Sequence, residues 1–204
     1  MNKSKKIQKN IKIQKNNKNT KKNKRIKKNT KKNSIGGVRI LQIDGEITTN
    51  PEILHEGKDF FRKMTNNIGE KQICELIMQN PHKNIIKIYA IGKDYIDMEL
   101  LYVDMNKQDM SNVKNIMMGV KAYLQSLGIM YIDWKLDNIG ISEEGEIKLF
   151  DFNASGLIDI ETKEWIIKPQ EWWSYNKAIK NGMVTPSDID NYAFDIEFSH
   201  KKYN

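Results

Sequence analysis

Two polar motifs on either side of a short predicted hairpin constrain the fold of this chain more than any other feature. The first contains Asp133, Lys135 and Asn138, and the second begins at Asp151. Either motif alone could be an ordinary polar turn or a helix cap. The spacing is five residues from Asp133 to Asn138 and eighteen from Asp133 to Asp151. Chance explains this combination poorly, and the pattern favours one functional site.

The rest of the chain predicts a β-rich part followed by a helical part. Runs of β-branched and aromatic residues bounded by turn residues predict strands over Val38–Ile43, Glu46–Thr49, Asp59–Met64, Ile85–Ile91, Tyr95–Leu101, Ile139–Ile141 and Glu146–Phe150. Apolar residues at helical spacing predict helices over Gly69–Gln79, Ser111–Leu127, Gln170–Lys180 and Ser187–Ser199. Hairpin turns are predicted at Asp44-Gly45 and Gly92–Asp94, helix caps at Ser111 and Ser187, and a helix stop at Gly128. This order is typical of an α+β fold, here with a linker near Glu99–Met105.

With these motifs in place, the chain resembles the protein kinase family. Tyr131–Asn138 is similar to the catalytic loop H-R-D-L-x-x-x-N, and Asp151–Asn153 is similar to the D-F-G turn. The resemblance covers about residues 38–200. It implies a two-lobed kinase-like α+β fold within residues 35–204, with a small β-rich N-lobe over about 35–100 and an abbreviated helical C-lobe over about 101–204.

The resemblance also implies phosphoryl transfer from ATP. In that reaction, magnesium ions and a lysine neutralise charge on the phosphoryl oxygens, while a carboxylate orients the attacking hydroxyl. By resemblance, Asp133 orients the substrate hydroxyl and Lys135 contacts the transferred phosphate. Asn138 and Asp151 would hold magnesium. Lys135, two residues after Asp133, is similar to the Ser/Thr kinase form of the loop rather than to the tyrosine kinase form.

Residues upstream resemble the nucleotide-binding part of the family. Phe61 and Lys63 lie in Phe-Phe-Arg-Lys, where kinases have V-A-I-K, so Lys63 would contact the α- and β-phosphates. Its ion-pair partner is Glu70 or Glu75, and the sequence leaves both open. The segment 97–101 is similar to the hinge that receives adenine through its backbone. This likeness implies adenine contacts from the backbone of Glu99 and Leu101.

Residues downstream also resemble the family. Asp190 is similar to the buried aspartate that braces the catalytic loop, and Pro169–Glu171 is loosely similar to A-P-E. Trp172 and Trp173 are predicted to pack in the core or between lobes rather than to form a ligand cage. His82 is predicted to have a structural role.

Three departures concern phosphate binding and switching. The chain has no G-x-G-x-x-G, and Gly36-Gly37 precedes the first predicted strand. Ile132 stands where the family has the arginine that pairs with a phosphorylated activation loop, so this mode of switching is not expected. Asn153 replaces the glycine of D-F-G, and we expect it to be tolerated because Asn accepts a positive φ more readily than most residues.

Two further departures concern the size of the site. Phe61 stands where a small alanine usually roofs the adenine pocket, while Gly140 replaces the larger residue of its floor. We interpret this as a shift of volume from floor to roof, which makes Phe61 and Gly140 candidate cofactor-binding residues. The chain stops at Asn204, and the later family helices that help to hold peptide substrates are expected to be missing.

A basic segment precedes this acidic body. Residues 1–34 contain fourteen Lys, one Arg and no acid, which leaves 19 basic and 26 acidic residues in the other 170. The segment has too few apolar residues to offset the entropy of ordering, so we predict that it is disordered. It is either a solubilising charge run or a segment for nucleic-acid binding or nuclear targeting. Base stacking is not expected there because the segment has no aromatic residue.

The sequence therefore supports an ATP- and magnesium-dependent Ser/Thr protein kinase whose protein substrate it does not reveal. One alternative is a pseudokinase binding module that uses the basic tail. Another is a small-molecule kinase, against which Lys135 counts. The single cysteine, Cys74, and the lack of a secretory signal or membrane-spanning run favour an intracellular protein, cytoplasmic or nuclear, that does not engage a membrane. Compact kinase-like chains with Lys/Asn-rich tails also resemble products of large DNA viruses, which would place the protein in a host cell or a virion.

Overall fold

The computed structural model describes residues 34–35, 38–40, 45–48, 55, 57–103 and 109–199. The chain divides into two units, residues 1–40 and 41–204. In the first unit, β1 (Ser34–Ile35) pairs antiparallel with β2 (Val38–Ile40). The predicted basic tail, apart from Ser34, and Gly36-Gly37 lie outside the described residues.

The second unit begins with an antiparallel sheet whose strand order is β3-β4-β6-β5. Its strands are β3 (Gly45–Thr48), β4 (Phe60–Met64), β5 (Ile88–Ile91) and β6 (Tyr95–Glu99). The predictions of β4 and of the β5–β6 hairpin are confirmed. The hairpin predicted across Asp44-Gly45 is wrong for the described residues, because β3 pairs with β4 while β2 pairs with β1.

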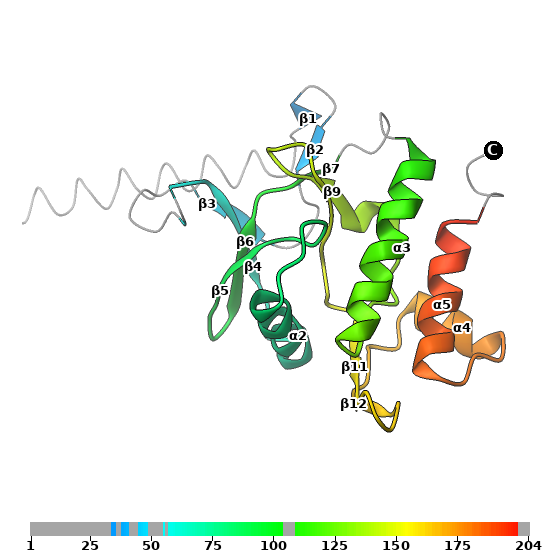
Figure 1. The fold of residues 1–204 in the computed structure, drawn as a ribbon. Coiled ribbons are helices and arrows are strands. Elements are labelled where there is room, and N and C mark those ends of the chain that lie inside the picture. The colour runs from blue at the N-terminus through cyan, green and yellow to red at the C-terminus, as the bar shows by residue number, and fades with distance from the viewer. Residues whose placement is uncertain are drawn as a thin grey trace, which may run out of the picture. The chain divides into compact units, whose positions relative to one another are not determined.

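Helix α2 (Ile68–Gln79) follows β4 after three residues and packs against β5 (Figure 1). Its predicted bounds are confirmed within one residue. Strand β5 is shorter than predicted because the chain just before it pairs elsewhere. Ile86 N donates to Leu149 O at 2.9 Å, and Leu149 N donates to Asn84 O at 2.9 Å. Tertiary pairing with the later hairpin therefore takes the first part of the predicted strand.

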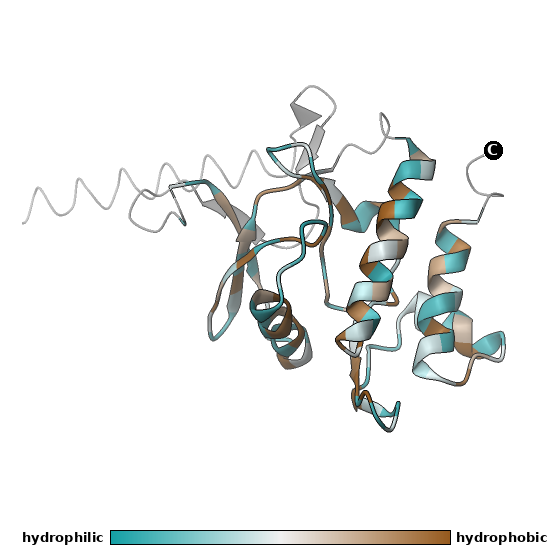
Figure 2. Cartoon of the chain, viewed as in Figure 1, coloured by the Kyte–Doolittle hydropathy of each residue, from teal (hydrophilic) through white to brown (hydrophobic). Residues whose placement is uncertain are grey.

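Helix α3 (Met110–Ser126) is amphipathic, and Figure 2 shows apolar and hydrophilic residues alternating around it. Asp109, not Ser111, caps it, since Ser111 N donates to Asp109 Oδ1 at 2.9 Å. Helix α5 (Pro186–Glu197) is likewise capped one residue before its start, by Thr185 rather than Ser187. Helix α4 (Trp173–Lys180) begins three residues later than predicted.

The predicted central hairpin is confirmed as β9 (Ile139–Ile141) and β10 (Ile147–Leu149), preceded by the short 3-10 helix η2 (Leu136–Asn138). Strand β7 (Tyr102–Val103) pairs with β9. A three-stranded sheet of order β12-β11-β8 was not predicted from the sequence. Its strands, β8 (Ile129–Met130), β11 (Gly156–Ile158) and β12 (Trp165–Ile167), are too short to carry a periodic signal.

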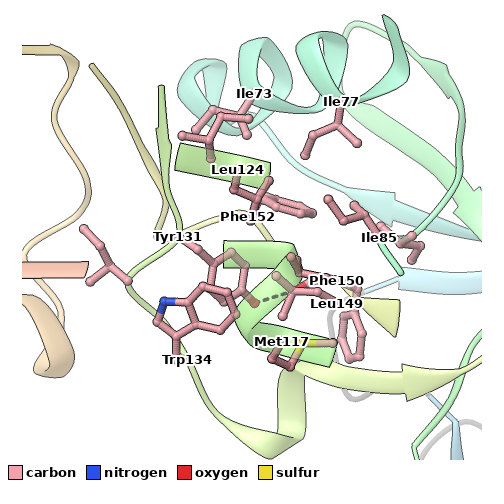
Figure 3. Packing of buried hydrophobic residues seen from close by; sticks show 14 of the residues in the cluster. Ile73, Ile77, Ile85, Met117, Leu124, Tyr131, Trp134, Leu149, Phe150 and Phe152 are labelled. Carbon is pink, nitrogen blue, oxygen red and sulfur yellow. Dashed lines mark hydrogen bonds between the residues drawn. The ribbon is translucent and has the colours of Figure 1, made fainter. Parts of the chain in front are cut away.

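The apolar core of the second unit joins α2, α3 and the segments around the hairpin. Figure 3 shows Tyr131 and Trp134 beside one another, with Phe152 near Tyr131. The Tyr131 and Phe152 ring centroids are 5.4 Å apart in an edge-to-face arrangement. Both polar motifs are therefore anchored by an aromatic residue within the core. Among the described residues, no helix is long and apolar enough to cross a membrane.

Gly128 ends α3 as predicted, with φ +77 and its N–H donating to Gln125 O at 3.0 Å. A Cβ at this position would lie 2.7 Å from Ile158 O. We expect Gly128→Ala to lower the free energy of unfolding by about 2 kcal/mol, because it combines left-handed strain with a backbone clash. Gly145, at φ +83 with nothing within 4 Å of an added Cβ, is the matched control.

Gly145→Ala should cost about 1 kcal/mol, from left-handed strain alone. Urea denaturation of both variants measures the difference. Equal losses would show that the close approach of Gly128 to Ile158 does not constrain the chain.

Candidate functional site

Lys63 stands between two carboxylates in the interior of the second unit. Its Nζ donates to Glu70 Oε1 at 2.5 Å and to Asp151 Oδ1 at 2.8 Å. Lys63 and Glu70 are 6% and 2% exposed. Burial alone lowers the pKa of Lys63, but the charges of Asp151 and Glu70 outweigh it and leave the pKa raised. Glu75 is exposed, so the structure pairs Lys63 with Glu70.

The short turn between β4 and α2 frees the Glu70 carboxylate for this pairing. Asn67 caps α2, its Oδ1 accepting from Glu70 N at 3.1 Å. In a capping box, the glutamate at this position normally reaches back to the N–H of the cap residue. Here Thr65 Oγ1 accepts that N–H at 3.1 Å and donates to Glu70 Oε2 at 3.0 Å.

Thr65 and Asn67 were missed as site residues. The Asn-x-x-Glu spacing is the sequence signal that could have found the cap. The role of Thr65 depends on the three-dimensional path of the turn.

The first polar motif forms a second cluster. Asp133 Oδ2 accepts from Lys135 Nζ at 2.5 Å and from Asn138 Nδ2 at 3.0 Å. Asn138 is 2% exposed, and its Nδ2 also donates to Asp133 O at 3.0 Å. The side chain of Lys135 is 41% exposed, against 15% for Asp133. The motif therefore presents one partly exposed lysine beside a carboxylate that a buried amide orients.

Phe150 links the two clusters through its backbone. Its N–H donates to Asn138 O at 3.0 Å, and its carbonyl accepts from Tyr131 Oη at 2.6 Å (Figure 3). Asp151 follows directly in the left-handed region, with φ 61. Burial raises the pKa of Tyr131 well above its usual range, so this phenol stays a donor. Tyr131 thus holds the turn that carries Asp151.

Asp190 of α5 braces the loop between Tyr131 and Lys135. Its Oδ1 accepts from Ile132 N at 2.9 Å and from Trp134 Nε1 at 2.7 Å. Its Oδ2 accepts from Gln125 Nε2 of α3 at 2.9 Å. Ile132 has φ 64, which is rare for a β-branched residue and needs such support. Asp190 therefore braces the loop between Tyr131 and Lys135, as its resemblance to the buried aspartate of protein kinases led us to expect.

The candidate adenine-binding residues lie in a closely packed region. Phe61 and Leu101 are 2% and 0% exposed. A Cβ at Gly140 would lie 2.8 Å from Leu101 Cβ, so Leu101 occupies the space that a larger floor residue would need. The Glu99 carboxylate accepts from Lys148 Nζ at 3.0 Å and from Lys87 N at 2.6 Å. The side chain of Glu99 therefore serves an internal ion pair.

One expectation about the second motif is wrong. Among the described residues, the non-glycine residues with positive φ are Ile132, Asp151 and Lys163, and Asn153 is not one of them. Asn153 instead uses its side chain, because its Oδ1 accepts from Asn67 Nδ2 at 2.9 Å. Its tolerance at this position therefore rests on hydrogen bonding rather than on left-handed backbone.

The remaining downstream residues lie apart from the two clusters. Glu171 is exposed and pairs with Lys168, three residues before it. Trp173 is 69% exposed, so its prediction as a packed residue is wrong; Trp172, at 43%, is also exposed. His82 accepts from Asn84 N through Nδ1 at 3.1 Å, and its ring packs on Tyr123, which fits a structural role.

Three curated proteins illustrate what the chain is similar to. It is 25% identical over 128 residues to mitogen-activated protein kinase pmk-1 of Caenorhabditis elegans, covering 63% of this chain and 30% of that protein. It is 24% identical over 180 residues to the serine/threonine-protein kinase PRR2 of Saccharomyces cerevisiae, covering 81% and 26%. It is 27% identical over 147 residues to ribosomal protein S6 kinase alpha-1 of Homo sapiens, covering 55% and 20%.

The chain is similar to serine/threonine protein kinases. The similarity is distant, and the chain spans less than a third of the length of each of these relatives. No protein-family model matches the chain. Nothing in these matches supports a viral origin. The kinase-like resemblance noted in the two motifs therefore extends to sequence similarity over more than half of the chain.

Proposed function

We propose that this chain is an ATP- and magnesium-dependent phosphotransferase of the serine/threonine protein kinase type. One observation carries the proposal: the backbone of Phe150 joins the Lys63–Glu70–Asp151 cluster to the Asp133–Lys135–Asn138 cluster. A scaffold that only binds partners has no need for a buried lysine between two carboxylates beside a second lysine–carboxylate pair. The two-lobed arrangement that the resemblance implies is part of the proposal.

Each side chain has a distinct task in this reaction. Lys63, held by Glu70, would bind phosphate oxygens of the nucleotide. Asp133, oriented by the Asn138 amide, would hold the acceptor hydroxyl and take its proton. Lys135, the most exposed of these cations, would neutralise the transferred phosphate. The protein thus supplies positioning and charge, which is most of what phosphoryl transfer requires.

The residues present fit magnesium. Among the described residues, no group of three or more His, Cys, Asp or Glu could hold a metal by itself. Asn138 and Asp151 would instead provide two ligands. Magnesium is commonly held in this way, by one or two protein oxygens together with substrate phosphates. When bound with the nucleotide, the ion would neutralise charge on the phosphate oxygens.

The test is a titration of the full chain with Mg-ATP, followed by thermal shift and by incorporation of labelled phosphate. We expect wild type to bind and to incorporate phosphate. Asp151→Asn should weaken binding by about tenfold or more, because it removes a charged ligand. Asp94→Asn, in the exposed β5–β6 turn, is the control and should match wild type. If wild type showed neither a thermal shift with Mg-ATP nor incorporation of labelled phosphate, the proposed kinase activity would be excluded.

A pseudokinase binding module is the second candidate, with residues 1–34 as a nucleic-acid-binding or targeting segment. The close contact between Leu101 and the place of a Gly140 side chain favours it, together with the buried ring of Phe61. These side chains reduce the room for adenine. Wild type that folds cooperatively but gives no Mg-ATP shift would support this candidate.

A further inference from the structure

Asn67 belongs both to helix α2 and to the turn that carries Asp151. Its Oδ1 accepts from Glu70 N at 3.1 Å. Its Nδ2 donates to Asn153 Oδ1 at 2.9 Å and to Asn153 O at 3.2 Å. The orientation of the Asn67 amide follows from its partners, since a backbone N–H can only donate and a backbone carbonyl can only accept. One side chain therefore satisfies the helix end and binds the turn.

This amide pair sits beside both carboxylates that hold Lys63. Glu70 is three residues after Asn67, and Asp151 is two residues before Asn153. Movement of α2 away from the turn would break the bonds of Asn67 to Asn153. It would also separate Glu70 from Lys63.

The packing next to the pair is close as well. A Cβ added to Gly69 would lie 2.9 Å from Ile167 Cγ2 of β12. The start of α2 is thus fixed by a cap, an ion pair and contact with a later strand.

We propose that the Asn67–Asn153 pair, called here the amide latch, holds α2 in the position that joins Glu70 to Lys63. The site is then assembled in the unmodified chain. A glycine at position 153 could not provide the side-chain acceptor, and Ile132 has no charge with which to bind a phosphorylated segment. The amide latch holds α2 whether or not the chain transfers phosphate. Only the inference that it keeps an active site assembled without phosphorylation rests on the proposed function.

Cys74 provides a probe of α2 that needs no activity. It is the single cysteine of the chain, it lies on α2, and it is 2% exposed. Burial raises the pKa of its thiol far above the ordinary value. A thiol reagent such as dithionitrobenzoate can therefore react only when α2 opens. The labelling rate of the folded protein reports that opening.

The experiment compares the full chain, shown to be unphosphorylated by intact mass, with three variants. Asn67→Ser keeps a helix-capping oxygen but loses the donor, and Asn153→Ala loses the side-chain acceptor. We expect Cys74 to label about fivefold faster in Asn67→Ser and about threefold faster in Asn153→Ala. The double variant should label about fivefold faster rather than about fifteenfold, because both changes break the same contact.

Thr185→Ala is the control, since it removes the cap of α5 without touching α2. It should leave the labelling rate near that of wild type. Unchanged rates in the Asn variants, multiplying factors in the double variant, or equal acceleration by Thr185→Ala would each overturn the latch. If the accelerations of Cys74 labelling do not multiply in the double variant, the amide latch is supported, even when Mg-ATP fails to slow the labelling of wild type. Failure of Mg-ATP to slow labelling would count against the proposed function alone.

Discussion

Replacing Asp190 with alanine is expected to lower the free energy of unfolding by about 4 kcal/mol. Asp190 is 1% exposed and accepts hydrogen bonds from Ile132 N, Trp134 Nε1 and Gln125 Nε2. The alanine would leave the first two donors buried without a partner, each at a cost of about 1–3 kcal/mol. It would also remove the contact that holds Ile132 at positive φ.

Urea denaturation followed by tryptophan fluorescence measures this loss. Asp195→Ala, an exposed position on the same helix, is the matched control and should remain within about 0.5 kcal/mol of wild type. Burial raises the pKa of Asp190, while its three donors act in the opposite direction. If Asp190→Ala lowered the free energy of unfolding by less than about 1 kcal/mol, water or a shifted side chain would be replacing the carboxylate. The loop between Tyr131 and Lys135 would then not depend on Asp190.

Lys63→Met should have an effect of similar size, and its dependence on pH identifies the cause. The variant leaves Glu70 and Asp151 facing one another without a cation, for which we expect a loss of about 4 kcal/mol near neutral pH. Binding of Mg-ATP should fall as well if the proposed function is correct. Lys58→Met is the control: its 2.8 Å pair with Glu144 is exposed on both sides, so no measurable loss is expected.

The sign of the pH effect follows from the raised pKa of Lys63 in wild type and from the charges that remain in the variant. In wild type, the raised pKa of Lys63 means that its contribution is fully present below its ordinary value of 10.5 and is lost only above it. In Lys63→Met, the loss of stability comes from repulsion between two buried carboxylates, and this repulsion requires both of them to be charged. The difference in free energy of unfolding between Lys63→Met and wild type should therefore become smaller on acidification. Adding Glu70→Gln should also narrow it, and a gap that neither change reduces would contradict this account.

The motif spacing, which is similar to that of protein kinases, predicted that the polar residues of the two motifs lie together, while their role in phosphoryl transfer stays a prediction. Lys63, Asp133, Asn138 and Asp151 indeed fall in two linked clusters. The choice between Glu70 and Glu75 required the structure. Helical periodicity placed both residues on the same helix, but only the direction of each side chain shows which one is buried.

Helix caps and strand ends were predicted less well, for local and for tertiary reasons. Ser111 and Ser187 have side chains that can cap a helix, but both lie inside their helices. The caps are Asp109 and Thr185, the residues just before each helix, which accept from Ser111 N and Asp188 N. Ile85 has strand propensity, yet it bridges to Leu149 instead of extending β5. Such pairings join residues far apart in sequence, and no local pattern encodes them.

The contact of Gly140 with Leu101 also restricts how homologous chains can diverge. A Cβ at position 140 would lie 2.8 Å from the Leu101 Cβ, so position 140 cannot gain a side chain while position 101 keeps leucine in place. The two sites should therefore covary: a descendant that acquires a larger residue at 140 would first need a smaller one at 101. Along that evolutionary path, the side chain at position 101 would become smaller before the one at position 140 could become larger.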